Sequence, residues 1–257
     1  MSPLQLHRNT GRFTLGKVIV VGIGPGNYEN MTVRADRALQ QCDAIIGYHV
    51  YVDLVRDQYP DKEFMTTPMT REAQRCQMAI DAAREGKNVA MVCSGDSGIY
   101  GMAALIYELR GESSDPEVEV VPGLTAACSG AAVLGAPLTH DFAVISLSDR
   151  LTSWEKIEKR LENAAEADLS MVLYNPASKG RPDHLKKACE ILLRKLPEDR
   201  ICGIVQHIGR EGENRRIMTL KQLKDADCDM FCTVFIGNEM TRVIDGQMVT
   251  PRGYRNV

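Results

Sequence analysis

Short apolar runs alternate with longer amphipathic segments along the whole chain, and this alternation constrains the fold more than any other feature. In runs such as KVIVVGI (17–23) and NVAMVCSG (88–95), the apolar residues are nearly continuous. A strand with one face in water would instead alternate apolar and polar residues. The sequence therefore predicts an α/β protein built on parallel sheets, with helices covering both faces of each sheet.

The predicted elements follow one another in regular order. The predicted strands are 17–23, 43–47, 88–95, 117–123, 142–147, 169–176, 200–208 and 230–237, and the predicted helices are 32–42, 70–86, 99–111, 153–167, 183–195 and 219–227. Thr32 is placed to cap the first helix, and Gly86 to end the second. A turn is expected within 243–249.

A change of composition near residues 123–140 divides the chain. This stretch is small, glycine-rich and nearly uncharged, which favours a closely packed helix. We expect an N-terminal extension (1–16), an α/β domain (17–123), a junction helix (124–141) and a second α/β domain (142–257). Two such domains imply a ligand cleft between them, because small ligands usually bind in clefts of this kind.

Length and charge argue against several classes of protein. The chain has 257 residues, a formal net charge of −3 and no block of Lys and Arg, so nothing indicates nucleic-acid binding. Its apolar runs fall short of the roughly 20 residues of a membrane helix. Residues 1–16 lack the apolar core of a secretory signal. We therefore expect a cytoplasmic protein with no membrane partner.

The eight cysteines are scattered, and only Cys228 and Cys232 lie close together in sequence. A structural zinc site needs four clustered ligands, and no second pair stands at a suitable spacing. Disulfide frameworks are rare in cytoplasmic proteins of this size. We expect buried, reduced thiols and no metal site.

The glycine-rich turn VVGIGPGN (20–27) follows the first strand, where a dinucleotide-binding protein carries GxGxxG. Here Asn27 occupies the third glycine position, Pro25 removes a backbone N–H, and no acidic residue ends the second strand. A nucleotide-dependent oxidoreductase is therefore disfavoured. A tight turn with no ligand remains an alternative.

Three more polar, glycine-bearing turns follow predicted strands: CSGDSGIYG (93–101), VPGLTAACSG (121–130) and LYNPASKGRPDH (173–184). Ligands of open α/β sheets bind at the carboxyl ends of strands. Each turn alone is commonly an ordinary loop, but their joint order favours a binding site.

That joint order resembles the tetrapyrrole methylases, over about residues 17–250. The motifs on which this resemblance rests are GxGPG after the first strand, SGDSGIYG in the first half and VPGLTA at the junction. GYHVYVDLV (47–55), APLTHDFAVISLSD (136–149) and GREGE (209–213) are further similar to the branch that methylates C17 of precorrin-3B or cobalt-factor III, with ring contraction, in cobalamin biosynthesis. Where other branches have GDP, this chain has Gly95-Asp96-Ser97.

The resemblance implies S-adenosylmethionine as cofactor, S-adenosylhomocysteine as product and a homodimer. The cofactor-binding positions carried over are Gly95, Asp96, Ile99, Tyr100, Thr125, Ala126, Asn175, Ile208 and Thr233. Core packing is the alternative for Ile99 and Ile208, and a helix cap is the alternative for Thr125. An activated sulfonium needs alignment and exclusion of water, so the absence of a catalytic triad is no obstacle.

For the tetrapyrrole substrate, the resemblance indicates Gly24, Pro25, Gly26 and Arg210, with Arg181 and Arg215 as further candidates. Ring contraction calls for an acid or base, and we expect Tyr48, His49 and His140 in that role. His207 fits a core histidine. Two alternatives remain: a sister methylase that modifies another macrocycle position, and a non-catalytic tetrapyrrole carrier.

Overall fold

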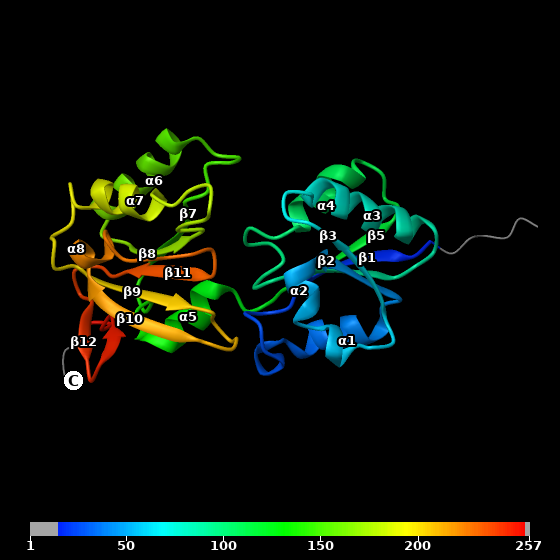
Figure 1. Ribbon diagram of the computed structural model, residues 1–257, viewed down its shortest axis with the longest axis horizontal. Helices are drawn as coiled ribbons and strands as arrows, with labels where there is room; N and C mark the ends of the chain where they lie inside the picture. Colours follow the sequence, from blue (N-terminus) through cyan, green and yellow to red (C-terminus); the bar gives the residue numbers. More distant parts are fainter. Residues whose placement is uncertain (1–14, 255–257) are drawn as a thin grey trace, which may run out of the picture. The chain divides into compact units, whose positions relative to one another are not determined.

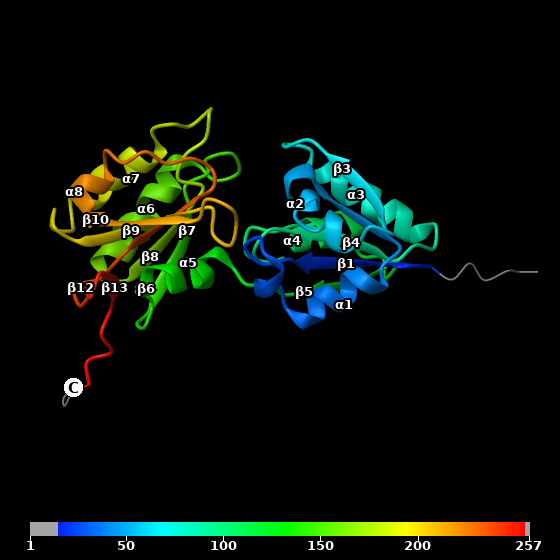
Figure 2. The same cartoon turned by 60° about the horizontal axis from the view of Figure 1, so that its bottom comes forward.

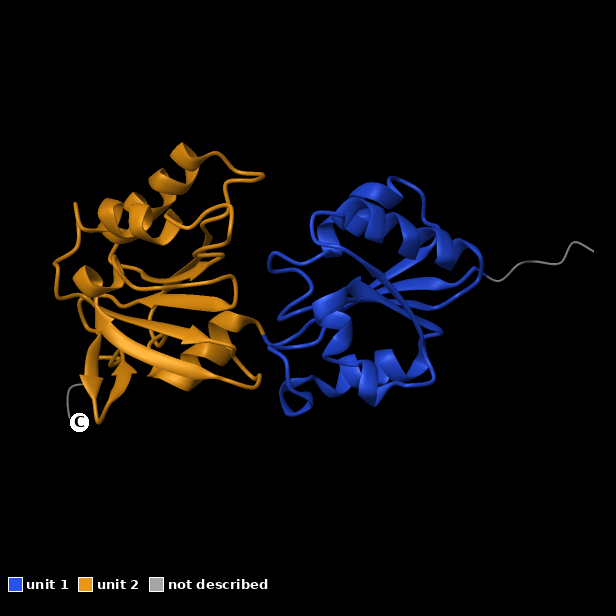
Figure 3. Ribbon diagram, in the orientation of Figure 1, with its two compact units in different colours: residues 1–124 blue, residues 125–257 orange. Residues whose placement is uncertain are grey.

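The computed structural model describes residues 15–254. The chain divides into two compact units, unit 1 (residues 1–124) and unit 2 (residues 125–257), which Figure 3 shows in separate colours. Most of the predicted extension over 1–16 lies outside the described residues. In the part that is described, no helix is long and apolar enough to cross a bilayer.

Unit 1 contains a five-stranded sheet in the order β3-β2-β4-β1-β5, and all of its strand pairs are parallel, as predicted. The strands are β1 (Lys17–Gly22), β2 (Ala44–Tyr48), β3 (Glu63–Thr67), β4 (Val89–Cys93) and β5 (Glu117–Val121). The α-helices are α1 (Val33–Gln41), α2 (His49–Asp53), α3 (Glu72–Arg84) and α4 (Ala103–Arg110), with 3-10 turns at Tyr28–Asn30 and Arg56–Gln58.

Helices cover both faces of this sheet, with α1 and α2 on one side and α3 and α4 on the other (Figure 1). Ile19 and Val21 pack in the cluster with Leu39 of α1, whereas Val18 and Val20 pack in the cluster of α3 and α4. Because successive side chains of a strand point to opposite faces, burial of both faces requires the continuous apolar run. At the start of α1 the Thr32 hydroxyl accepts the Ala35 N–H at 3.1 Å, which is the predicted cap.

Unit 2 contains a five-stranded sheet in the order β10-β9-β11-β8-β7. Its strands are β7 (Phe142–Ser146), β8 (Ser170–Tyr174), β9 (Ile201–Gln206), β10 (Asn214–Thr219) and β11 (Cys232–Ile236). Only β7 and β8 pair in parallel, while the pairs β8–β11, β11–β9 and β9–β10 are antiparallel. The prediction of a parallel sheet is therefore wrong for this unit. Continuous apolar runs report burial of both faces, which strands of either direction can have.

The helices of unit 2 are α5 (Ala126–Leu134), α6 (Trp154–Glu166), α7 (His184–Leu192) and α8 (Leu220–Leu223). Residues of α6, α7 and α8 share one hydrophobic cluster with the sheet, and residues of α5 share another. The small residues of α5 permit its close packing, since a Cβ at Gly130 would lie 2.8 Å from Cζ of Phe235. The helix predicted over 219–227 is shorter in the structure, where α8 ends at Leu223.

A small sheet completes unit 2, with β6 (Gly135–Ala136), β12 (Arg242–Ile244) and β13 (Gln247–Val249) side by side in Figure 2. Asp245 and Gly246 both have positive φ, 50° and 69°, which suits the tight turn of a hairpin. The turn expected within 243–249 is thus present. Of the predicted junction helix 124–141, residues Ala126–Leu134 are helical and Gly135 begins β6.

Candidate functional site

The loops after β1 and β4 are joined directly through their backbones. Gly24 donates its N–H to the carbonyl of Gly95 at 3.1 Å, and Gly95 donates to the carbonyl of Gly24 at 2.7 Å. Both residues have positive φ, 74° and 73°, a conformation that suits glycine. The two loops therefore form one rigid rim at the carboxyl edge of the unit 1 sheet.

The loop after β5 packs against the same rim. A Cβ on Gly123 would collide with the carbonyl oxygen of Gly95 and with the backbone of Gly22. Three loops thus meet where only glycine fits. In the first loop, Gly24 and Pro25 are buried and Gly26 is half-buried. A Cβ on Gly24 would lie 2.6 Å from the carbonyl oxygen of Asn30, so this glycine permits close backbone packing.

Asp96 holds the loop after β4 in shape. Its Oδ1 accepts the N–H groups of Gly98 (2.8 Å) and Ile99 (3.0 Å), and its Oδ2 accepts the N–H of Gly123 (2.9 Å). A carboxylate has about four acceptor positions, and three are taken here by backbone donors. The Asp96 side chain therefore fixes the geometry of two loops, a role that the sequence analysis did not assign to it.

Ile99 and Tyr100 project from the same loop. Ile99 is 40% exposed and Tyr100 is 54% exposed, so the alternative of core packing does not apply to Ile99. Tyr100 has φ of 55°, which is unusual for a bulky residue and is often found at functional sites. The loop thus presents two apolar side chains at the rim.

Tyr48 and His49 lie at the same edge, because β2 runs parallel to β4. Tyr48 ends β2 and is half-buried, while His49 begins α2 and is exposed. Their ring centroids are 4.4 Å apart, and Tyr48 also contacts Tyr51 edge-on at 5.3 Å. Two groups able to transfer protons therefore stand beside the rim.

The buried thiol of Cys93 ends β4 beneath these loops. Its sulfur accepts the Met102 N–H at 3.4 Å, and burial raises the pKa of Cys93 to about 11. It stays a neutral thiol at physiological pH, so it is a packing residue and has no nucleophilic character.

In unit 2 the corresponding edge is formed by the carboxyl ends of β7, β8 and β9 and the start of β11. Asn175 follows β8 with φ of 56°, and its Nδ2 donates to the Ser146 hydroxyl at 3.0 Å. His207, after β9, also has a positive φ of 55°. A residue with a left-handed backbone conformation thus follows each of the strands β8 and β9.

Tyr174 connects this edge to α5. Its hydroxyl accepts the Ala127 N–H at 2.7 Å and hydrogen-bonds the hydroxyl of Thr125. Thr125 is the N-cap residue of α5 and makes no side-chain cap of its own. The tyrosine hydroxyl therefore takes over part of the cap and holds Thr125 and the first turn of α5 at the edge.

The remaining predicted residues of unit 2 differ in accessibility. Ile208 is 7% exposed and packs in the α5 cluster, so its side chain is a core side chain. Thr233 is also buried, in β11, paired with Val205 of β9. Arg210 is half-buried, with Cζ 5.7 Å from the ring centroid of Phe231. All three belong to the edge that carries Asn175.

His140 lies elsewhere. It precedes β7, which starts at Phe142, and so stands at the opposite edge from Ser146 and Asn175. Its Nε2 donates to the carbonyl of Pro251 at 2.9 Å. The structure does not bring His140 together with the other predicted residues of unit 2.

Tyr174 is the main site residue that the sequence analysis did not single out. Its partners lie 47 and 49 residues away, so no local pattern announces the contact. Ser97 is a second example, since its buried hydroxyl donates to the carbonyl of Val121 at 2.9 Å and ties β4 to β5. Across residues 15–254, no cluster of His, Cys, Asp or Glu is suited to hold a metal ion.

The protein is therefore an α/β protein of two units, with a parallel sheet and a glycine-lined rim in unit 1 and a mixed sheet in unit 2. Proteins of this class bind small ligands at strand ends. Residues 17–224 match the family model for Tetrapyrrole (Corrin/Porphyrin) Methylases. The chain belongs to this family of methyltransferases, and the resemblance seen in the sequence is confirmed.

Two curated relatives are similar over nearly their whole length. A probable cobalt-factor III C(17)-methyltransferase of Salmonella typhimurium is 46% identical, over 91% of this chain and 98% of the relative. A precorrin-3B C(17)-methyltransferase of a Sinorhizobium species is 39% identical, over 93% of this chain and 97% of the relative.

Two solved structures are also similar. The methyltransferase CobJ is 34% identical with a TM-score of 0.84, over 92% of this chain and 100% of that one. Uroporphyrin-III C-methyl transferase from Thermus thermophilus, solved with S-adenosyl homocysteine, is 22% identical with a TM-score of 0.72, over 86% and 97% of the two chains. The second similarity supports the fold alone.

Proposed function

We propose that the chain transfers a methyl group from S-adenosylmethionine to C17 of cobalt-factor III, with ring contraction, in cobalamin biosynthesis. The observation that carries this proposal is the 46% identity to the Salmonella relative of that name, over almost the full length of both chains. The lower identity, 39%, to the relative named for metal-free precorrin-3B makes the cobalt form the first choice.

We propose cofactor-binding residues for each unit by itself. In unit 1 these are Gly95, Asp96, Ile99 and Tyr100, and in unit 2 they are Thr125, Ala126, Asn175, Ile208 and Thr233. The left-handed conformations of Tyr100 and Asn175 support the assignment, because strained backbone collects at ligand sites. Ile208 and Thr233 are buried, so we assign their contribution to backbone groups.

The fit to an adenosine-bearing ligand rests on the loop after β4. Ile99 and Tyr100 offer exposed apolar surface, and the glycines around Asp96 let the backbone come close to a ligand. When bound, S-adenosylmethionine supplies an already activated methyl group. The chain then has to orient the cofactor and the substrate and to exclude water. A rim fixed by backbone hydrogen bonds suits this role.

Tyr48 and His49 are the proposed proton-transfer residues for ring contraction, and Gly24, Pro25, Gly26 and Arg210 are the proposed substrate contacts. A matched pair of variants separates the two steps. For Tyr48→Phe and His49→Gln we expect methyl transfer to persist while the spectral change of ring contraction slows. Loss of both steps together would argue for a positioning role of these residues.

The assay that tests the whole proposal incubates the purified protein with labelled S-adenosylmethionine and either cobalt-factor III or precorrin-3B, and follows mass and absorbance. One added methyl on cobalt-factor III supports the proposal, and transfer only to precorrin-3B moves it to the metal-free substrate. S-adenosylhomocysteine binding without transfer to either points to a sister methylase. Tetrapyrrole binding without cofactor binding points to a carrier.

The predicted homodimer and cytoplasmic location rest on the family resemblance and stay proposals. Light scattering of the purified protein measures the first, and a mass of two chains supports it. Fractionation of the source cells measures the second.

A further inference from the structure

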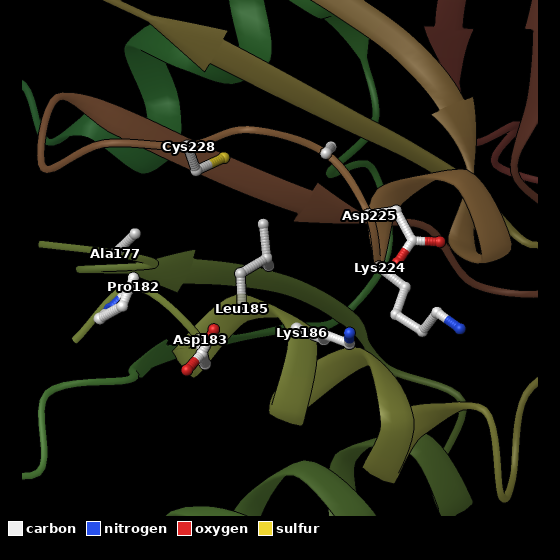
Figure 4. Close-up of a pocket in the computed structure, with 9 residues that line it drawn as sticks. Ala177, Pro182, Asp183, Leu185, Lys186, Lys224, Asp225 and Cys228 are labelled. Atoms are coloured by element: carbon white, nitrogen blue, oxygen red, sulfur yellow. The ribbon is translucent and has the colours of Figure 1, made fainter.

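A pocket of about 250 Å³ lies in unit 2, between the start of α7 and the segment after α8. Its apolar wall is formed by Ala177, Pro182, Leu185 and Ala226, its charged groups are Asp183, Lys186, Lys224 and Asp225, and it includes the side chain of Cys228. Figure 4 shows the sulfur of Cys228 among these side chains. Cys228 packs with the cluster of α6, α7 and α8, whereas Ala126 and Ile208 belong to the α5 cluster.

Cys232 is hydrogen-bonded to Asp229, the residue that follows Cys228. The Cys232 N–H donates to the carbonyl of Asp229 at 3.3 Å, which folds the chain into a tight turn. The Asp229 N–H in turn points to Sγ of Cys232 at 3.4 Å. That nitrogen is bonded to the carbonyl carbon of Cys228, so the second sulfur rests against the backbone of the first cysteine. Cys232 itself is 4% exposed.

The chemistry of this pair differs from that of the other buried cysteines. Burial raises the pKa of Cys42 to about 11 and those of Cys76 and Cys189 to about 12, so these thiols carry almost no thiolate near neutral pH. The hydrogen bond between the two thiols instead lowers the pKa of Cys232, because the Cys228 S–H stabilises a thiolate beside it. The same hydrogen bond, together with burial, raises the pKa of Cys228. The pair therefore gives up its first proton more readily than the isolated buried thiols.

We infer that Cys228 and Cys232 form a reactive dithiol that low-molecular-weight disulfides entering the adjacent pocket convert to an intramolecular disulfide. This inference does not depend on the methyl transfer proposed above. The accessible sulfur is Cys228, since it lines the pocket and Cys232 is buried.

The exchange is balanced in two steps. The pair loses one proton from Cys232. The proton of Cys228 then passes to Cys232 as the Cys228 sulfur attacks one sulfur of the small disulfide RSSR, and one RS⁻ leaves. Cys232 then loses its proton and attacks the Cys228 sulfur of the mixed disulfide, which releases the second RS⁻. Both leaving thiolates take up the protons, so two cysteines are oxidised and one RSSR is reduced to two RSH.

The pocket indicates the class of disulfide. Lys186 and Lys224 match carboxylates, and Asp183 and Asp225 match ammonium groups. Peptide disulfides built from zwitterionic amino acids, such as glutathione disulfide, carry both. A neutral disulfide such as that of 2-mercaptoethanol lacks these charges and is a suitable comparison.

The test uses the full chain, reduced and then incubated with glutathione disulfide, with thiol counting and peptide mass mapping over time. We expect two of the eight thiols to be lost, a Cys228–Cys232 link in the map, and recovery on reduction. The pair should react about tenfold faster than Cys128, the exposed cysteine of α5. The neutral disulfide should react more slowly with the pair.

Variants separate the two thiols. Cys232→Ala should retain glutathione on Cys228 as a stable mixed disulfide, and Cys228→Ala should leave Cys232 unmodified. Cys128→Ala, the matched control, should form the internal link at the rate of the unaltered protein. The inference is overturned if the unaltered protein keeps both thiols while Cys128 is modified, or if the mapped disulfide joins other cysteines. That mapping needs no variant and so holds even if a variant folds poorly.

Discussion

At the scale of single residues, Asp96 shows how one carboxylate can hold two loops in shape. Asp96→Asn replaces one acceptor oxygen by an amide group that cannot accept, which leaves a backbone N–H at Gly98, Ile99 or Gly123 unpaired. A lost bond of this kind costs about 1–3 kcal/mol. We expect about tenfold faster hydrogen exchange at the affected amides and weaker S-adenosylhomocysteine binding.

Glu108→Gln is the matched control for that change, because it makes the same substitution at an exposed position of α4. It should alter neither exchange nor binding. Unchanged exchange at Gly123 in Asp96→Asn would show that the carboxylate is not what holds the two loops.

In unit 2, the Tyr174 hydroxyl likewise holds a neighbouring segment, the start of α5. Tyr174→Phe removes the hydroxyl that accepts the Ala127 N–H and contacts Thr125. The first turn of α5 then loses part of its cap, at a cost of about 1–3 kcal/mol. We expect faster exchange at Ala127 and a several-fold weaker affinity for S-adenosylhomocysteine by calorimetry. Tyr107→Phe, at an exposed tyrosine, should change neither, and equal behaviour of the two variants would contradict the role of Tyr174.

At the scale of elements, the sequence predicted the strands buried on both faces and the edge strands β5 and β7, but it missed the edge strands β3 and β10. β1 and β4 stood out because every position is apolar or glycine after Lys17. β10 was missed because it begins with Asn214, Arg215 and Arg216, all exposed at the edge of the sheet. An edge strand in water needs no apolar pattern, and polar residues protect it from pairing with other chains.

The candidate site was predictable to the extent that it depends on where strands end. Gly24, Gly95 and Asp96 follow parallel strands of unit 1, so the strand-end rule placed them at one edge. The expectation for His140 is not supported in the same way, since His140 precedes its strand instead of following it. Tyr174 and Thr125 meet only through the packing of α5 on the sheet, and no local sequence pattern encodes that meeting.

The meeting of three loops at the unit 1 rim gives an element-scale prediction. Gly123→Ala forces a methyl group into the backbone of Gly22 and Gly95. Overpacking of this kind costs about 1–3 kcal/mol or more, so we expect a lower thermal midpoint and loss of cofactor binding. Gly180→Ala is the control, because no heavy atom lies within 4 Å of the added carbon. An unchanged midpoint for Gly123→Ala would mean that the rim can move apart freely.

Glu119 connects three elements of unit 1, through Lys17 of β1 at 2.7 Å and Arg34 of α1 at 3.0 Å. Hydrogen bonds from Lys17 and then Arg34 lower the pKa of Glu119 below its ordinary value of 4.5. The stabilisation is therefore complete above pH 4.5. It declines below that, because the unfolded chain takes up the proton first, and it is gone below the lowered pKa of the folded state.

Glu119→Gln should thus lower the thermal midpoint at pH 7 by a small amount, since pairs this exposed contribute about 0.2–1 kcal/mol. The difference from the unaltered protein should shrink as the pH falls below 4.5. Glu117→Gln, at an exposed position of the same strand, should show no such trend. A difference that grows in acid would contradict the sign of the shift.

At the scale of the whole molecule, each unit has hydrophobic clusters of its own. The buried residues of the clusters around Leu39 and Ile80 all belong to unit 1, and those around Leu161 and Phe235 all belong to unit 2. Units with separate cores can unfold in separate steps. The chain also contains a single tryptophan, Trp154, at the start of α6 in unit 2.

This arrangement predicts that core variants will shift the unfolding transitions followed by two optical probes, tryptophan fluorescence and circular dichroism, by different amounts. Leu39→Ala and Leu161→Ala each remove a fully buried side chain, at a cost of about 2–5 kcal/mol. Because Trp154 reports unit 2 alone, Leu161→Ala should lower the midpoint of its fluorescence change in urea, and Leu39→Ala should leave that midpoint in place. Circular dichroism reports helices of both units, so Leu39→Ala should broaden or split its transition. Equal shifts of both probes in both variants would show instead that the two cores unfold as one cooperative body.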